Sequence, residues 1–300
     1  QAFLVAVIKG PSYYNPWRYP ERAQERRDLV LRLLMEAGGL NVAQYQAAVE
    51  SPLGLRKANK SVHQKLPAFF SVVKHELANR FGDALLQQSG IKVYTTLDPI
   101  AQEAAEKAVV QTLKQLGKND ETLQVGMVLT DKYSAGIAAM VGDKVPSYRG
   151  FNRAVEIRRP IGSLIKPFVY TTALNQGKKY NLESPLKDEP ITLKNGQGKT
   201  WSPQNVDKKF RGQVPLLTAF KKSMNVPTVN LGMAIGVSDV ATTLDKAGWR
   251  EKIPEYPSML LGAVNGSPLM VAQVFQTIAD DGRYRHLNSV TTVLNAHTSR

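Results

Sequence analysis

The chain has 300 residues, of which 43% are hydrophobic and 21% charged, as in an ordinary globular protein of one large or two smaller domains. It contains no cysteine, which excludes a disulfide framework, thiol catalysis and cysteine-ligated zinc, and its four histidines lack metal-ligand spacing. A net charge of +14 is typical of proteins with an anionic partner, but the basic residues are scattered, with no run of five, which favours a generally basic solvated surface.

The first residues, Ala2 to Ile8, are almost all apolar, yet they lack the start methionine, charged region and cleavage site of a signal peptide. No stretch approaches eighteen apolar residues, so no membrane span is predicted. A sequence that opens inside a hydrophobic element and stops at Arg300 without a closing signal is expected to be a fragment of a longer gene product.

Helical periodicity begins at Pro20 and ends at Gly38-Gly39, and a second helix is predicted from Asn41, a plausible N-cap, to about Val49. Residues 55–66 are polar and basic, which predicts a linker. Beyond it we expect a helix over 69–86, a strand over 91–97, a helix over 101–116 capped by Asp98-Pro99, and strands over 126–130 and 137–141.

The remainder predicts a helix starting at Gly162-Ser163, a polar excursion over 183–215, and mostly helices to about residue 281. Strands followed by many helices indicate an α+β domain.

Ser163 and Lys166 form an S-x-x-K pattern that places both side chains on one side of a helix. A serine hydroxyl is a poor nucleophile unless a neighbouring group takes its proton, and a lysine kept neutral by burial can do so. The helix start also offers its positive end to developing negative charge. An N-cap serine beside an exposed lysine is the structural alternative.

Three further S-x-x-K matches begin at Ser71, Ser89 and Ser184, and their context argues against a catalytic role. Ser71 is predicted to cap an amphipathic helix. Ser89 is followed by a glycine and a strand, so its lysine would not return to it. Ser184 precedes a proline in a loop.

Ser223-Met224-Asn225 is the single S-x-N sequence of the chain. A hydroxyl and an amide two residues apart can relay a proton and hold a substrate amide. A plain turn is the structural alternative.

S-x-x-K followed by S-x-N resembles the serine penicillin-recognising enzymes, whose motif set S-x-x-K, S-D-N and K-T-G is well known. The surrounding residues resemble the transpeptidase domain of class A penicillin-binding proteins. They are Arg159-Pro160-Ile161-Gly162-Ser163 with Lys166-Pro167, Ser202-Pro203-Gln204-Asn205, Ser223-Met224-Asn225-Val226-Pro227-Thr228 and Gly266-Ser267-Pro268-Leu269-Met270-Val271-Ala272 with Asp281-Gly282-Arg283-Tyr284.

The N-terminal segment contains Lys9-Gly10-Pro11-Ser12-Tyr13-Tyr14-Asn15-Pro16 and resembles the end of a glycosyltransferase family 51 domain. Its sequence most resembles the 1B group of class A proteins. The resemblance divides the chain into the end of that domain (1–55), a linker region (56–95) and a transpeptidase domain (96–300). It implies a β-lactamase/transpeptidase-like fold with helices on a central antiparallel sheet, whose later strands are expected beyond Arg300.

The resemblance also implies peptidoglycan cross-linking. Ser163 is the expected nucleophile, Lys166 the base, Ser223 a proton relay and Asn225 a substrate ligand. The family's K-T-G is absent, and Gly198-Lys199-Thr200 is a decoy that precedes S-x-N. The catalytic glutamates of the glycosyltransferase are expected upstream of Gln1.

No cofactor is expected for transpeptidation, whereas a divalent metal could serve the glycosyltransferase. Stem peptides, lipid II, β-lactams and cell-wall regulators are the implied partners, at the periplasmic face of the inner membrane. A non-catalytic module that binds cell-wall polymer remains open. So does a nucleic-acid binder, which is supported by charge alone. A carboxypeptidase or β-lactamase would deliver the acyl group to water, and the attached glycosyltransferase segment argues against both.

Overall fold

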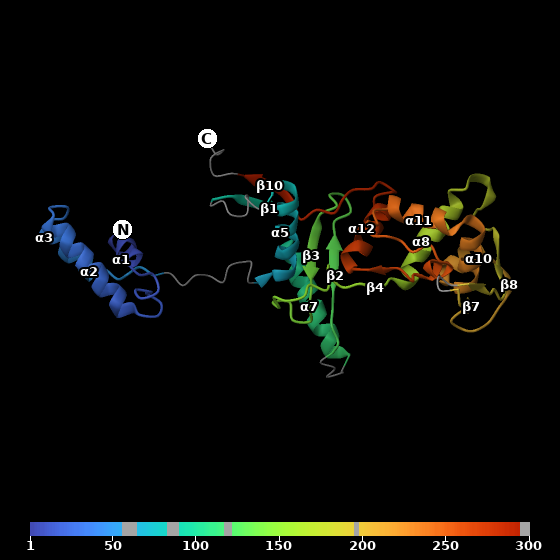
Figure 1. The fold of residues 1–300 in the computed structure, drawn as a ribbon, viewed down its shortest axis with the longest axis horizontal. Coiled ribbons are helices and arrows are strands. Elements are labelled where there is room, and N and C mark those ends of the chain that lie inside the picture. The colour runs from blue at the N-terminus through green and yellow to red at the C-terminus, as the bar shows by residue number, and fades with distance from the viewer. Residues whose placement is uncertain (56–64, 83–89, 117–121, 195–197, 295–300) are drawn as a thin grey trace. The chain divides into compact units, whose positions relative to one another are not determined.

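The computed structural model describes the chain except for residues 56–64, 83–89, 117–121, 195–197 and 295–300. Its internal contacts divide the chain into two compact units, residues 1–61 and residues 62–300, coloured from blue to red in Figure 1. Each unit has its own set of contacts and is described by itself. The polar linker predicted over 55–66 lies mostly outside the described residues, whereas most of the wider linker region 56–95 is described.

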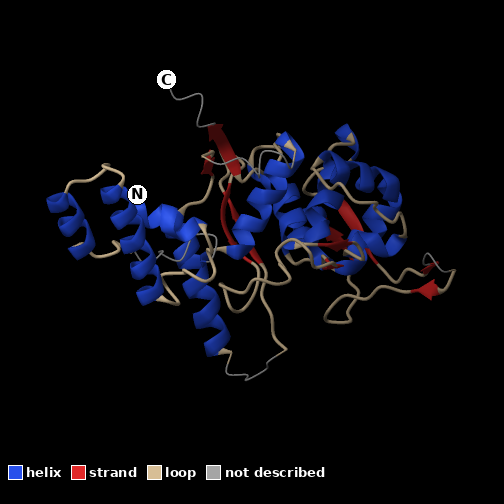
Figure 2. Ribbon diagram, turned by 60° about the vertical axis from the view of Figure 1, so that its left-hand side comes forward, coloured by secondary structure: helices blue, strands red, loops and turns tan. Residues whose placement is uncertain are grey.

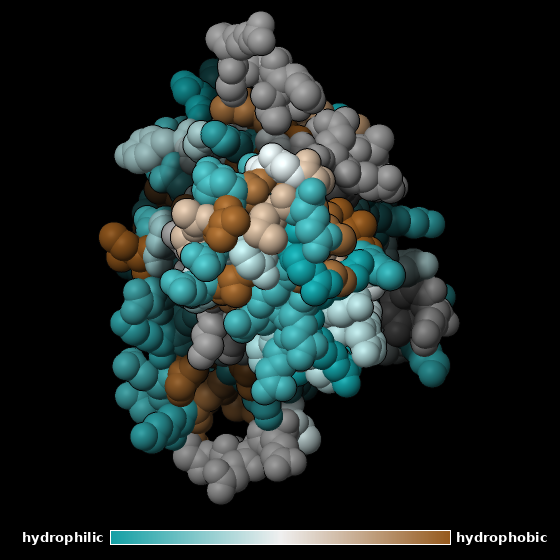
Figure 3. Space-filling model, turned by 90° about the vertical axis from the view of Figure 1, so that its left-hand side faces the viewer, coloured by the Kyte–Doolittle hydropathy of each residue, from teal (hydrophilic) through white to brown (hydrophobic). Residues whose placement is uncertain are grey.

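The described residues of the first unit form the helices α1 (Ala2–Ile8), α2 (Pro20–Glu36) and α3 (Val42–Glu50), as the sequence predicted for the last two. α2 begins at a proline, whose missing N–H costs nothing there. α3 begins with a capping box, in which Asn41 Oδ1 accepts from the Gln44 N–H and Gln44 Oε1 accepts from the Asn41 N–H. On the face drawn in Figure 3, hydrophobic residues are interspersed with hydrophilic ones.

The second unit has α+β architecture, with helices surrounding short antiparallel strand pairs (Figure 2). β2 (Met127–Thr130) pairs with β3 (Ile137–Val141), as predicted for a hairpin. α5 (Pro67–Phe81) and α7 (Pro99–Gln115) pack on β3, and Asp98 caps α7 by accepting from the N–H groups of Ile100 and Ala101. α5 therefore joins the core of this unit although it lies in the region predicted as a linker.

β1 (Lys92–Thr95) pairs with β10 (Val290–Leu294) near the other end of the chain. The local sequence pattern predicted β1 but not β10. The hydrogen bonds that stabilise β10 come from β1, which is distant in the sequence. The helix predicted over 69–86 begins earlier, at Pro67. Ser71 is consequently no N-cap: its hydroxyl lies one turn inside α5 and donates to Ala68 O.

The segment predicted as a polar excursion over 183–215 contains two strand pairs that the sequence did not predict. β5 (Pro185–Asp188) pairs with β8 (Gly212–Pro215), and β6 (Leu193–Lys194) pairs with β7 (Thr200–Trp201). The inward positions of β5 are Leu186 and Asp188. Because a charged residue occupies one of the two inward positions, the sequence of β5 does not show the alternation of apolar and polar residues that predicts a strand.

The rest of the unit is a helical lobe. Its elements are β4 (Arg159–Pro160), η1 (Gly162–Ile165), α8 (Lys166–Leu174), η2 (Gly177–Lys179), α9 (Leu216–Lys221), α10 (Asn225–Ile235), α11 (Val237–Lys246), η3 (Pro257–Leu261), β9 (Asn265–Gly266) and α12 (Pro268–Ala279). α8 packs against α10 and α11 around a core that includes Phe168, Trp249 and Leu260. Within the described ranges, no helix is long and apolar enough to cross a membrane.

Candidate active site

The segment that carries Ser163 turns sharply from strand to helix. β4 leads into Gly162, whose φ of +59° is left-handed, and η1 then continues directly into α8. Ser163 is exposed, whereas Ile165 two residues later is fully buried and anchors the turn in the core. The helix start predicted at Ser163 is thus a 3-10 turn, and the α-helix proper begins at Lys166.

Lys166 is buried, with 2% of its surface exposed. Its Nζ donates to the carbonyl oxygen of Ser223 at 2.6 Å, to Ser223 Oγ at 3.1 Å and to Asn225 Oδ1 at 2.8 Å. Among the described residues, no hydrogen bond joins Lys166 to Ser163. Burial disfavours the ammonium form and lowers the pKa of Lys166 to about 8. The S-x-x-K and S-x-N motifs therefore meet at the side-chain amine of Lys166, whose lowered pKa makes the neutral form more accessible.

Ser223 sits in the turn between α9 and α10 with a φ of +49°. A residue with a side chain rarely adopts this left-handed conformation, and strained residues of this kind cluster at functional sites. Here the conformation lets both the carbonyl oxygen and the hydroxyl of Ser223 reach Lys166 Nζ.

Asn225, the first residue of α10, is oriented by a loop that precedes it by about twenty positions. Its Nδ2 donates to the carbonyl oxygen of Gln204 at 2.9 Å, while its Oδ1 accepts from Lys166. The buried Asn205 accepts from the N–H groups of Asn225 and Val226, both at 3.0 Å, and so caps α10. The amide of Asn225 is held at both ends.

Asn205 is in turn held by Asp188, which is completely buried. Asn205 Nδ2 donates to Asp188 Oδ1 at 2.6 Å, and the Arg211 N–H donates to Asp188 Oδ2 at 3.0 Å. The Arg211 guanidinium also lies 3.6 Å from that carboxylate. Sequence reasoning assigned no role to Asp188 or Arg211. The sequence signal that was present is Ser202-Pro203-Gln204-Asn205, which resembles the family but names no function by itself.

A second buried bond ties α8 to α10. The Tyr170 hydroxyl and Thr228 Oγ1 are 2.8 Å apart, and Thr228 also donates to Met224 O. Burial raises the pKa of Tyr170 to about 12, so the phenol stays neutral and acts as a structural tie rather than a base.

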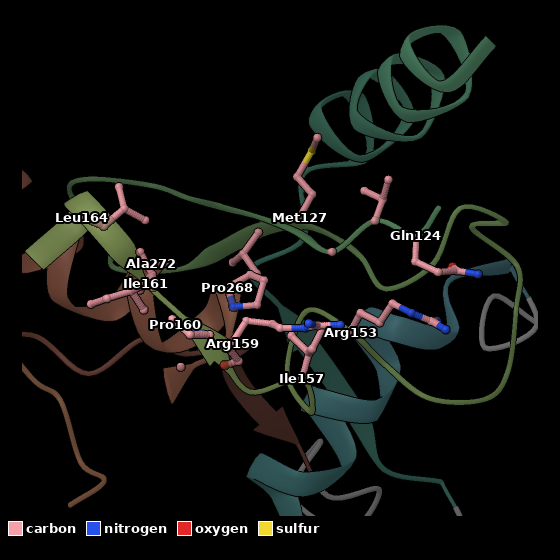
Figure 4. A pocket seen from close by; sticks show the side chains of 16 residues that line it. Gln124, Met127, Arg153, Ile157, Arg159, Pro160, Ile161, Leu164, Pro268 and Ala272 are labelled. Carbon is pink, nitrogen blue, oxygen red and sulfur yellow. The ribbon is translucent and has the colours of Figure 1, made fainter. Parts of the chain in front are cut away.

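A cavity of about 600 Å³ lies beside the Ser163 segment (Figure 4). Its walls include Ile161 and Leu164 from that segment, Pro268 and Ala272 from α12, and Met127 from β2. The lining is mainly apolar, and neither Ser163 nor Lys166 contributes to it. The cavity therefore adjoins the candidate site without containing its polar groups.

The other candidate residues named in the sequence analysis do not belong to the cluster around Lys166. Ser184 Oγ accepts from the Asn181 N–H within its own loop, and Thr200 of the decoy Gly198-Lys199-Thr200 begins β7. Ser89, His63 and His297 lie outside the described residues. Within the part of the chain that the structure describes, no three His, Cys, Asp or Glu side chains gather as metal ligands do.

Comparison with known proteins gives a consistent result. Residues 125–299 match the model of the penicillin binding protein transpeptidase domain. The chain is 45% identical to penicillin-binding protein 1B of Vibrio cholerae serotype O1 over 296 residues, and 44% identical to that of Escherichia coli K12 over 299 residues. Each alignment covers 98% of this chain but only 38% and 35% of the respective relative.

Solved structures agree. Penicillin-Binding Protein 1A from Haemophilus influenzae matches 99% of this chain and 58% of its own with a TM-score of 0.77, at 20% identity, which shows the fold. The PonA1 protein of Mycobacterium tuberculosis in complex with penicillin V matches 76% of this chain and 62% of its own, with a TM-score of 0.65 and 25% identity. The resemblance to class A proteins of the 1B group is confirmed, and the chain belongs to the penicillin-binding protein transpeptidase domain family.

Proposed function

We propose that this domain cross-links peptidoglycan stem peptides by acyl transfer through Ser163. The observation that carries the proposal is the buried amine of Lys166, which joins the S-x-x-K and S-x-N motifs in one hydrogen-bonded cluster. A serine nucleophile, a lysine of lowered pKa and a second serine in contact with that lysine are the groups that acylation requires.

In the acylation step, Ser163 Oγ attacks the carbonyl carbon of the D-Ala–D-Ala amide and gives its proton to neutral Lys166. Lys166 returns this proton through the Ser223 hydroxyl to the leaving nitrogen, the C–N bond breaks, and D-alanine departs. Asn225 holds the peptide backbone of the donor. An amine of a neighbouring stem peptide then attacks the ester carbonyl carbon and the acyl C–O bond breaks. The proton lost by the amine passes through Lys166 to Ser163 Oγ, which regenerates the hydroxyl. The backbone N–H of Ser163 is a donor to the oxyanion, as in the family it resembles.

β-Lactams acylate the same residue in this proposal, because the strained lactam presents an equivalent amide to Ser163. The solved complex of PonA1 with penicillin V supports this choice of ligand. No cofactor takes part in these steps.

The whole gene product is proposed to be a bifunctional enzyme that also polymerises glycan strands from lipid II at the periplasmic face of the inner membrane. The similarity to penicillin-binding protein 1B of two organisms supports this extension. A divalent metal would assist the glycosyltransferase, and cell-wall regulators would bind the same protein.

The test is labelling of the full-length gene product with a fluorescent penicillin, followed by mass spectrometry of the labelled peptide. We expect one adduct on Ser163 and no labelling of Ser163→Ala. Ser184→Ala and Ser71→Ala are matched controls, since each removes the serine of another S-x-x-K sequence, and both should label normally. An adduct on either control serine, or undiminished labelling of Ser163→Ala, would refute the assignment of Ser163 as the nucleophile. Absence of labelling in the unsubstituted protein would favour a non-catalytic module.

A further inference from the structure

The turn that presents Ser163 is held from behind by a distant segment of the chain, η3 and β9 with the residues between them. β4 pairs with β9, so that Arg159 lies opposite Gly266 and Pro160 opposite Asn265. The ladder continues toward the nucleophile, because the Ile161 N–H donates to Val264 O at 3.0 Å and the Gly162 N–H donates to Gly262 O at 3.1 Å. The residues immediately before Ser163 are therefore fixed by backbone hydrogen bonds to residues 262–266.

Gly262 marks the closest approach of the two segments. It is buried, and its φ of +82° is left-handed. A Cβ atom at this position would lie well inside 3.0 Å of three Gly162 backbone atoms, O, C and N, a separation that real Cβ atoms essentially never show. No flexible side chain is available to move aside, so a substitution must displace the backbone next to Ser163.

The same segment is also packed closely against the hydrophobic core. Gly266 lies against the ring of Trp249, and Leu260 fills the space beside Gly232. Trp249 is 1% exposed and Leu260 is fully buried, so both belong to the hydrophobic core. Close packing of this kind transmits displacement instead of absorbing it. The segment is thus in close contact with both the core and the nucleophile turn.

We propose that Gly262 is a positioning residue for Ser163: its missing side chain sets the distance of the Gly162–Ser163 backbone from the core, and so places the Ser163 hydroxyl and N–H for acylation. The inference rests on the proposed function of Ser163. A Cβ at residue 262 would push the nucleophile turn outward by a distance on the order of 1 Å, and a misplacement of that size can cost about 10²-fold in rate.

Gly282 provides a matched control. Its φ of +83° is within a degree of the +82° of Gly262, but nothing lies within 4 Å of the position its Cβ would take. Gly262→Ala and Gly282→Ala therefore carry the same backbone cost, and only the former touches Gly162. The experiment measures penicillin acylation of the full-length gene product, separated into the constant for reversible binding and the first-order acylation rate.

We expect Gly262→Ala to lower the first-order rate by about 10²-fold, with reversible binding close to that of the unsubstituted protein. Gly282→Ala should acylate normally. Equal acylation rates in the two variants would overturn the proposal while leaving the role of Ser163 intact. Absence of acylation in the unsubstituted protein would instead refute the proposed function.

A second variant covers the case in which Gly262→Ala does not fold. Trp249→Phe shortens the ring behind Gly266 and gives the segment space to move back. The double variant Gly262→Ala/Trp249→Phe should acylate faster than Gly262→Ala where that protein folds, and more slowly than Trp249→Phe alone in every case. A double variant as fast as Trp249→Phe would count against the positioning role.

Discussion

The two segments that meet at the candidate active site are held in different ways. The Ser163 segment is positioned by its backbone, through the β4–β9 ladder and the approach of Gly262 to Gly162. The segment from Ser223 to Asn225 is positioned by buried side chains, chiefly Lys166 and Asn205. Steric bulk should therefore damage the first segment, whereas loss of single polar atoms should damage the second.

The largest effect is expected at Lys166, where the two segments meet. Lys166→Ala removes the proton acceptor and all three hydrogen bonds to Ser223 and Asn225, so acylation should fall by roughly 10²–10⁴-fold. Lys166→Arg keeps a positive charge but cannot deprotonate, and it should be equally inactive. Stopped-flow acylation with a fluorescent penicillin measures both. An active Lys166→Arg enzyme would exclude the role of Lys166 as a base.

The pH dependence of acylation sharpens the same point. Because burial lowers the pKa of Lys166 to about 8 from 10.5, its neutral form becomes the major form above about pH 8. The rate should rise about tenfold per pH unit below that value and level off above it. The free energy of unfolding should also rise with pH. Burial of the ammonium form of Lys166 destabilises the folded protein fully below about pH 8, and this destabilisation is lost as the pH rises from there toward 10.5. A rate that is constant from about pH 6 to about pH 9 would contradict the assignment.

An intermediate effect is expected at Asn205. Asn205→Ala uncaps α10 and leaves buried Asp188 without one of its donors, so Asn225 should lose its orientation and acylation should drop on the order of 10-fold to 10²-fold. Asn41→Ala is the control, because it also removes an asparagine cap, in this case from α3 of the other compact unit. If both variants acylate alike, the buried polar network has no positioning function.

The smallest effect is expected when two substitutions of Ser223 are compared, which distinguishes the backbone strain at this residue from the role of its hydroxyl. Ser223→Ala and Ser223→Gly both remove the hydroxyl and should slow acylation equally. Glycine alone relieves the left-handed backbone, so the glycine variant should be more stable by roughly 1 kcal/mol. Thermal unfolding of the two proteins measures the difference. Equal stability would mean that the φ of Ser223 stores no strain.

Much of the local structure was predictable from sequence. Asn41 and Asp98 mark the starts of α3 and α7 because a cap acts on N–H groups two or three residues away. The β2–β3 hairpin was predictable for a similar reason, since its strands are neighbours in the chain. Ser163 and Lys166 are three residues apart, so their proximity along the chain was predictable, but the exposure of Ser163 and the burial of Lys166 were not.

What the tertiary structure alone decided depends on residues far apart in sequence. The pairing of β1 with β10, the burial of Asp188 under Asn205, and the approach of Gly262 to Gly162 have no local signature. Residues 262 and 282 are both glycine, and the sequence does not distinguish them. In the folded protein the Gly162 backbone lies against Gly262, whereas nothing lies within 4 Å of the position that a Cβ of residue 282 would take. Local patterns predict which side chains an element offers, whereas packing determines what each side chain, or its absence, meets.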